Sequence, residues 1–197
     1  MTPFLSLVLG IAYSADAPLL RWKRSPVLAA VCILVVRALA VQLGFYFHIH
    51  TVLDRDALVT PALAFACVFM CFFSVVIAIT KDLPDVVGDR KYNISTFATR
   101  LGVRNISRLA VTMLMACYAS AVVLAFRMPT SFNTPLMVAG HVVLAAVLLG
   151  KALELDRRAY VRTAIDAFYK GIWQLFYACV VRFTSVSISS HQSSVNT

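Results

Sequence analysis

Apolar residues fall into five long runs along the chain, and short polar connections separate them. The runs cover about residues 27–47, 58–80, 106–126, 135–153 and 164–183. A helix needs about 20 apolar residues to cross the hydrocarbon core of a bilayer, so each run predicts one membrane-spanning helix. An earlier run, from Pro3 to Tyr13, is too short to span alone, and we interpret it as the last half of a helix that begins upstream. The pattern predicts an all-α integral membrane helical bundle with five full spans and a partial N-terminal helix.

The end of the chain departs from this pattern. Residues 184–197 are rich in Ser and Thr, contain no charged residue and show no apolar periodicity. Such a segment cannot bury enough apolar surface to offset its ordering entropy, which predicts a disordered tail. We therefore expect one membrane domain over residues 1–183, followed by the tail.

Composition and charge agree with a membrane protein. The chain is 60% hydrophobic and 14% charged, against about 25% charged in a typical soluble domain. The net charge of +9 does not indicate a nucleic-acid partner, because successive connections hold three, one, six, one and four Lys or Arg residues. This alternation follows the positive-inside rule and puts the first, third and fifth connections on one side of the membrane. The five cysteines lie inside the apolar runs, away from other metal-ligand side chains, and we interpret them as buried apolar thiols.

Three carboxylates follow the second full span directly. Asp82, Asp85 and Asp89 lie within KDLPDVVGDR and make up a third of the nine acidic residues. On an unbroken helix they would share an arc of about 60°, but Pro84 disfavours helical geometry at the residue before it. Carboxylate oxygens at this spacing suit Mg²⁺, which often brings phosphates with it. The alternative interpretation is a solvated acidic loop that caps a membrane helix.

Basic residues flank the carboxylates and favour the metal hypothesis. Lys81 precedes them and Arg90 follows them, while Arg21, Lys23 and Arg24 form a second basic group in a connection predicted on the same side. A metal ion and cations together stabilise the charge of a leaving diphosphate. A diphosphate ester handled inside an apolar bundle implies a lipid tail among the helices, which indicates a prenyl diphosphate as the substrate.

The same residues carry a resemblance to a known family. The run KDLPDVVGDRKYNISTFATRLGVRN resembles the second aspartate-rich motif of the UbiA-type membrane prenyltransferases. Tyr13-Ser14 with Pro18 and RWKR resembles a connection of that family, and GIWQLFYA from Gly171 to Ala178 resembles its last helix. Within the family, the motif and its continuation are most similar to the plastid homogentisate solanesyltransferases of plastoquinone biosynthesis.

The resemblance implies a fold, a reaction and a set of site residues. The family's fold has about nine membrane spans, and in it Mg²⁺ joins two aspartate-rich motifs to a prenyl diphosphate. The resemblance to the plastid group implies a chloroplast membrane. The prenyl group, which is solanesyl in the group that the motif resembles most, passes to the ring of homogentisate, and homogentisate loses its carboxylate. Carried over residue by residue, the metal-binding and catalytic residues are Asp82, Asp85 and Asp89. The expected diphosphate contacts are Lys23 and Lys81, with Arg21, Arg24 and Arg90 as further candidates.

The chain also departs from the family pattern. The first aspartate-rich motif is absent, Val87 stands where the family often has an acidic residue, and the resemblance stops after Ala178. We therefore expect a truncated chain that is weakly active or inactive by itself. The alternatives are a UbiA-type transferase for another aromatic acceptor or a phytyl donor in the tocopherol pathway, and a non-catalytic membrane-protein fragment.

Overall fold

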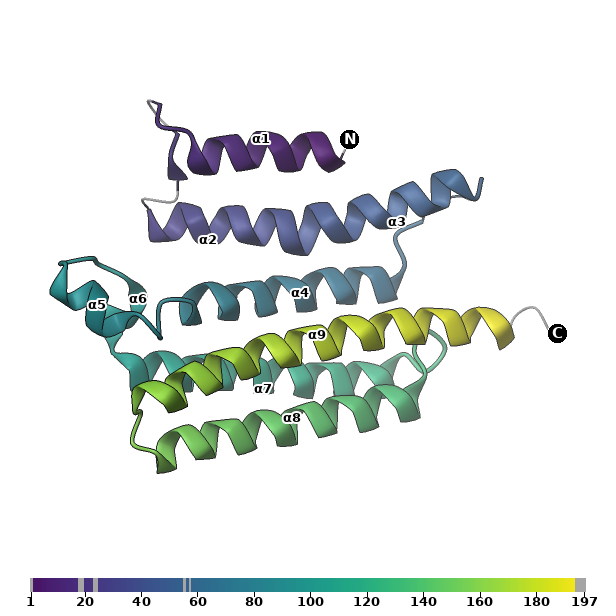
Figure 1. The fold of residues 1–197 in the computed structure, drawn as a ribbon. Coiled ribbons are helices and arrows are strands. Elements are labelled where there is room, and N and C mark those ends of the chain that lie inside the picture. Colours follow the sequence, from purple (N-terminus) through teal and green to yellow (C-terminus); the bar gives the residue numbers. More distant parts are fainter. Residues whose placement is uncertain (1, 18–19, 23–24, 55, 57, 194–197) are drawn as a thin grey trace. The chain divides into compact units, whose positions relative to one another are not determined.

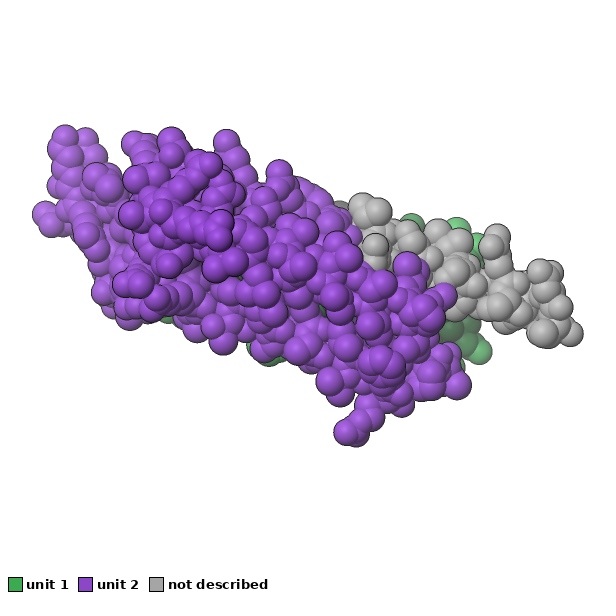
Figure 2. Space-filling view, turned by 90° about the horizontal axis from the view of Figure 1, so that it is seen from below, with its two compact units in different colours: residues 1–78 green, residues 79–197 purple. Residues whose placement is uncertain are grey.

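The computed structural model describes residues 2–17, 20–22, 25–54, 56 and 58–193, and every regular element in these ranges is a helix (Figure 1). The chain divides into two compact units, residues 1–78 and 79–197, which Figure 2 colours separately. The domain boundary expected at residue 183 stays a prediction. Helix α9 extends through Ser193 and so continues into the segment for which disorder is predicted.

Unit 1 holds the first helices of the chain. Helix α1 (Thr2–Ser14) packs against a continuous helical segment made of α2 (Pro26–Leu34), the π-helical turn η2 (Val35–Ala40) and α3 (Val41–Val52). Ser25 caps this segment, since its side chain accepts a hydrogen bond from the Leu28 N–H at 3.5 Å and proline follows at the first helical position. Most of α4 (Pro61–Thr80) also belongs to this unit.

Unit 2 is built on three long helices, α7 (Val103–Arg127), α8 (Thr134–Arg157) and α9 (Arg162–Ser193). Helix α8 packs against both α7 and α9, and short connections make successive helices antiparallel. Buried residues of α7 recur every three or four positions, which places them on one face of the helix. They include the small residues Ala110, Ala121 and Ala125, and small side chains let membrane helices approach closely.

One cap and one contact to α7 hold the start of α8. Asn133 accepts a hydrogen bond from the Leu136 N–H at 3.2 Å, and Thr134 donates to the Ala125 carbonyl at 3.0 Å. The opposite end of α8 lies beside the start of α7, because Arg104 forms an ion pair with Asp156 at 4.0 Å. The third and fifth connections therefore share one end of unit 2, as the charge alternation predicts.

Three helices of the described residues are long and apolar enough to cross a membrane: α4, α7 and α8. They correspond to the predicted spans 58–80, 106–126 and 135–153. The predicted spans 27–47 and 164–183 also lie on helical segments, but neither is among these three, so their crossing stays a prediction. The all-helical membrane fold expected from the sequence is confirmed.

Candidate functional site

The acidic motif, KDLPDVVGDR, begins as a turn and continues into a short helix. Residues 81–85 form a turn directly after α4, and α5 (Val86–Lys91) begins after Asp85. The buried Leu83 anchors this turn, and its N–H donates to the Thr80 carbonyl at 3.1 Å. Pro84 thus coincides with a break in the helix, as its fixed geometry predicts. The three aspartates consequently do not lie along one unbroken helix.

The three carboxylates nevertheless interact electrostatically. Asp82 is half-buried, and this burial is the main cause that raises the pKa of its carboxyl group. The positive charge of Lys81 lowers that pKa, and the negative charges of Asp89 and Asp85 raise it further. Like charges raise a carboxyl pKa when they lie near it, so the turn gathers negative charge that a bound cation would neutralise.

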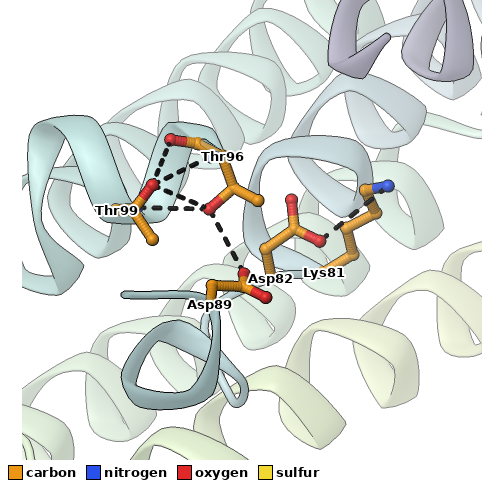
Figure 3. A network of polar contacts seen from close by, with 5 residues as sticks. All are labelled: Lys81, Asp82, Asp89, Thr96 and Thr99. Carbon is orange, nitrogen blue, oxygen red and sulfur yellow. Dashed lines mark hydrogen bonds and ion pairs between the residues drawn. The ribbon is translucent and has the colours of Figure 1, made fainter. Parts of the chain in front are cut away.

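Two threonines extend this cluster (Figure 3). The Thr96 hydroxyl donates to Asp89 Oδ2 in a long contact of 3.5 Å. Thr96 also caps α6 (Phe97–Leu101), because it accepts from the Thr99 N–H at 3.2 Å while its own N–H donates to Thr99 Oγ1 at 2.8 Å. This reciprocal capping holds the Thr96 hydroxyl on the side of Asp89, so the start of α6 helps to position a candidate metal ligand.

Sequence reasoning did not identify Thr96 or Thr99 as part of the site. A usable signal was present, since threonine is a preferred residue before a helix and a polar side chain three positions later can complete a capping box. What the sequence could not supply was the proximity of Asp89, which comes from the close packing of α5 and α6.

The predicted cationic residues lie in different parts of the chain. Lys81 lies in the turn itself, with its Nζ 3.8 Å from Asp82 Oδ1. Arg90 lies exposed in the last turn of α5. Arg21 belongs to unit 1, where it pairs with Asp16. Lys23 and Arg24 lie outside the described residues.

The donor set is chemically suited to Mg²⁺. No group of three His, Cys, Asp or Glu side chains in the described part of the chain surrounds a common metal position. Mg²⁺ does not require one, because it is usually held by one or two carboxylates together with substrate phosphates and water. Asp82 and Asp89, with Asp85 close enough to raise the pKa of Asp82, provide oxygen ligands of the kind it prefers.

Comparison with known proteins places these residues in context. The chain is 46% identical over 176 residues to homogentisate phytyltransferase 1 of Arabidopsis thaliana, a match that covers 89% of this chain and 44% of that protein. It is 44% identical to the homogentisate geranylgeranyltransferase of Triticum aestivum over 88% of this chain and 42% of that protein. For the homogentisate solanesyltransferase of Arabidopsis thaliana the identity is 45%, over 83% of this chain and 42% of that protein.

These identities are too similar to separate the three donor types, so the finer resemblance to the solanesyl group is not distinguished from the others. The chain spans less than half the length of these curated relatives. No solved structure matches it significantly. The family model for the UbiA prenyltransferase family matches residues 2–179. This range includes the acidic turn, Thr96, Thr99, the long helices α4, α7 and α8, and α9 as far as residue 179. The chain therefore belongs to the UbiA prenyltransferase family.

Proposed function

We propose that this chain takes part in the Mg²⁺-dependent transfer of a prenyl group from a prenyl diphosphate to homogentisate, with the diphosphate bound at the turn after α4. The observation that carries the proposal is the network of polar contacts at this turn, in which Lys81 pairs with Asp82 and the Thr96 hydroxyl donates to Asp89 (Figure 3). The three carboxylates of the acidic motif and Lys81 lie immediately after an apolar helix that can cross a membrane. A diphosphate at the end of such a helix leaves its lipid tail at the level of the hydrocarbon core.

Each side chain of the turn has a role in binding the diphosphate. Asp82 and Asp89 would hold the metal, with Asp85 as a further ligand on the exposed side of the turn. Mg²⁺, when bound, neutralises diphosphate charge and so makes the diphosphate a better leaving group. Lys81 adds a positive charge at the same turn, and Thr96 restrains the Asp89 carboxylate.

The reaction that follows from this arrangement is an electrophilic substitution. The carbon–oxygen bond to the diphosphate breaks, the oxygen keeps the electron pair, and the prenyl group becomes an allylic cation. The electron-rich ring of homogentisate forms the new carbon–carbon bond. The attacked ring carbon then gives up its hydrogen as a proton, which restores aromaticity. The carboxymethyl side chain loses CO₂, and the electron pair of the broken carbon–carbon bond takes up a proton to leave a methyl group.

The proposal also includes the prenyl donor and the membrane in which the chain lies. The continuation of the acidic motif, GDRKYNIST, resembles the solanesyl group, so we propose solanesyl diphosphate as the donor and plastoquinone formation as the role. The names of two of the relatives describe them as chloroplastic, which supports a plastid membrane. Phytyl and geranylgeranyl diphosphate are the competing donors.

The direct test is binding, because it measures the proposed contacts of the acidic turn themselves. The purified full chain is titrated with labelled geranylgeranyl diphosphate in detergent micelles, with Mg²⁺ and then with excess EDTA. We expect binding that requires Mg²⁺ and that weakens in Asp82→Asn. Losing a hydrogen-bonded charged partner costs about 1.5–3 kcal/mol, which corresponds to about a 10- to 150-fold weaker affinity.

Asp56→Asn is the matched control, since Asp56 is an exposed carboxylate in another connection and its removal should leave the affinity unchanged. Equal affinity of Asp82→Asn and the unsubstituted chain, or binding that persists in EDTA, would refute the proposed site. Membranes that hold the chain are then supplied with homogentisate and each of the three donors in turn. A product formed from only one donor identifies it.

A further inference from the structure

A second candidate site lies in unit 2, at the end where α7 begins and α8 ends. A cavity of about 380 Å³ opens there between α7, α8 and the first turns of α9, which is within the usual size of ligand pockets. Its apolar wall includes Val111 of α7, Leu149 and Leu153 of α8, and Phe168 of α9. Leu149 and Leu153 are exposed, so the cavity is a groove that opens to the outer surface of the helices.

The floor of the groove contains a polar atom without a partner. Ser107 is only 3% exposed and lines the groove, yet its hydroxyl oxygen forms no hydrogen bond within the described part of the chain. A buried polar group without a partner is unfavourable, and such groups in native structures usually have a ligand, ion or water. This orphan hydroxyl therefore indicates that something polar occupies the groove.

The charged side chains at the mouth of the groove indicate the sign of the charge that its occupant carries. Arg108 lines the groove, and none of the ion pairs between described residues involves it. Asp156 also lines the groove, but it is already engaged by Arg104 at 4.0 Å and by the Tyr160 hydroxyl, which donates at 3.1 Å. Two arginines and one aspartate leave one net positive charge, which matches one phosphodiester.

The backbone beside the groove is held in an unfavourable conformation. Ala159 and Tyr160, in the connection from α8 to α9, have φ values of 49° and 58°, a region that non-glycine residues seldom adopt. The bond from Tyr160 to Asp156 holds this connection against the end of α8. Strained residues of this kind cluster where a ligand or a switch requires them.

The depth of the groove fits an amphipathic molecule. Arg108 lies five residues into α7 and Val111 eight residues into it, or about 8 and 12 Å along the axis. The groove thus begins near one end of α7 and continues along a helix that is long and apolar enough to cross a membrane. Arginine-lined pockets between membrane helices are known to bind phospholipid headgroups.

We propose that this groove binds one anionic membrane phospholipid. Its phosphate pairs with Arg108 and accepts a hydrogen bond from Ser107, and the first part of an acyl chain lies along Leu149, Leu153 and Phe168. The site is separate from the acidic turn and does not depend on the proposed prenyl transfer.

Native mass spectrometry of the full chain tests the proposal. The chain is released from micelles that contain equal amounts of palmitoyl-oleoyl phosphatidylglycerol and the phosphatidylcholine with the same acyl chains. We expect one retained lipid, with phosphatidylglycerol preferred. Arg108→Gln should lower that preference about fivefold, the effect of one basic residue near an anionic lipid. Arg127→Gln removes a charge from the opposite end of the same helix and should leave the preference unchanged.

Two further variants and one competitor separate the remaining outcomes. Ser107→Leu fills the groove and should abolish retention of both lipids. If this buried substitution lowers the helix content, Arg108→Glu takes its place, because it reverses the charge of an exposed side chain. An equal loss in the Arg108→Gln and Arg127→Gln variants would show that only overall charge matters, and would overturn the site. Displacement of the lipid by excess inorganic diphosphate would instead assign the groove to a soluble phosphate.

Discussion

Replacement of Gly102 by alanine should loosen the junction of α6 and α7 without any steric clash. Gly102 has φ 82° and ψ 153°, a conformation that is open almost only to glycine. A Cβ atom built on it meets nothing within 4 Å, so the whole penalty comes from the backbone. That penalty is about 1–3 kcal/mol for a residue held in such a region.

The penalty should appear locally, because Gly102 ends one helix and begins the next. Its N–H donates to the Ala98 carbonyl at 3.0 Å, and its carbonyl accepts from the Ile106 N–H at 3.2 Å. Hydrogen–deuterium exchange of the full chain in micelles, read on peptides over residues 96–106, measures the opening of these bonds. A penalty of 1–3 kcal/mol predicts exchange that is about 5- to 150-fold faster.

Gly88→Ala is the matched control for this experiment. Gly88 lies inside α5, and a Cβ atom there also meets nothing within 4 Å. Alanine is favoured over glycine in a helix by about 0.5–1 kcal/mol, so exchange over α5 should slow. Unchanged exchange around residue 102 in Gly102→Ala, or faster exchange in both variants, would refute the reasoning from backbone conformation.

Two further predictions concern side chains near the two sites. Thr96→Val removes the cap of α6 and the contact to Asp89, which should destabilise α6 by about 1 kcal/mol and speed exchange of the Thr99 amide about fivefold. Thr96→Ser keeps the hydroxyl, so a similar effect in both variants would contradict the capping argument. Burial and the hydrogen bond to Asp156 raise the pKa of Tyr160 above its ordinary value of 10.0. The folded chain therefore favours the neutral phenol, and stability falls as the pH rises above that value. The ultraviolet tyrosinate signal lost in Tyr160→Phe should appear above pH 10, and a midpoint at or below that pH would contradict the shift.

Several parts of this protein follow from the sequence because they depend on local pattern. The long apolar runs predict α4, α7 and α8 within a few residues of their observed bounds, since a bilayer requires spans of a fixed length. Pro84 predicts the break between α4 and α5 because its ring fixes the backbone geometry. The motif from Lys81 to Asn105 predicts the family, and the match over residues 2–179 confirms it.

Other parts depend on contacts between residues distant in sequence, and only the tertiary structure supplies these. The packing of α5 and α6 brings Thr96 within reach of Asp89, seven residues away. The antiparallel packing of α7 and α8 brings Arg104 to Asp156 and opens the groove over Ser107. Hydropathy decides which segments enter the membrane, and the distribution of charge decides which helix ends lie on the same side of it. The approach of particular side chains depends on how neighbouring helices rotate and pack, which the pattern along a single helix does not encode.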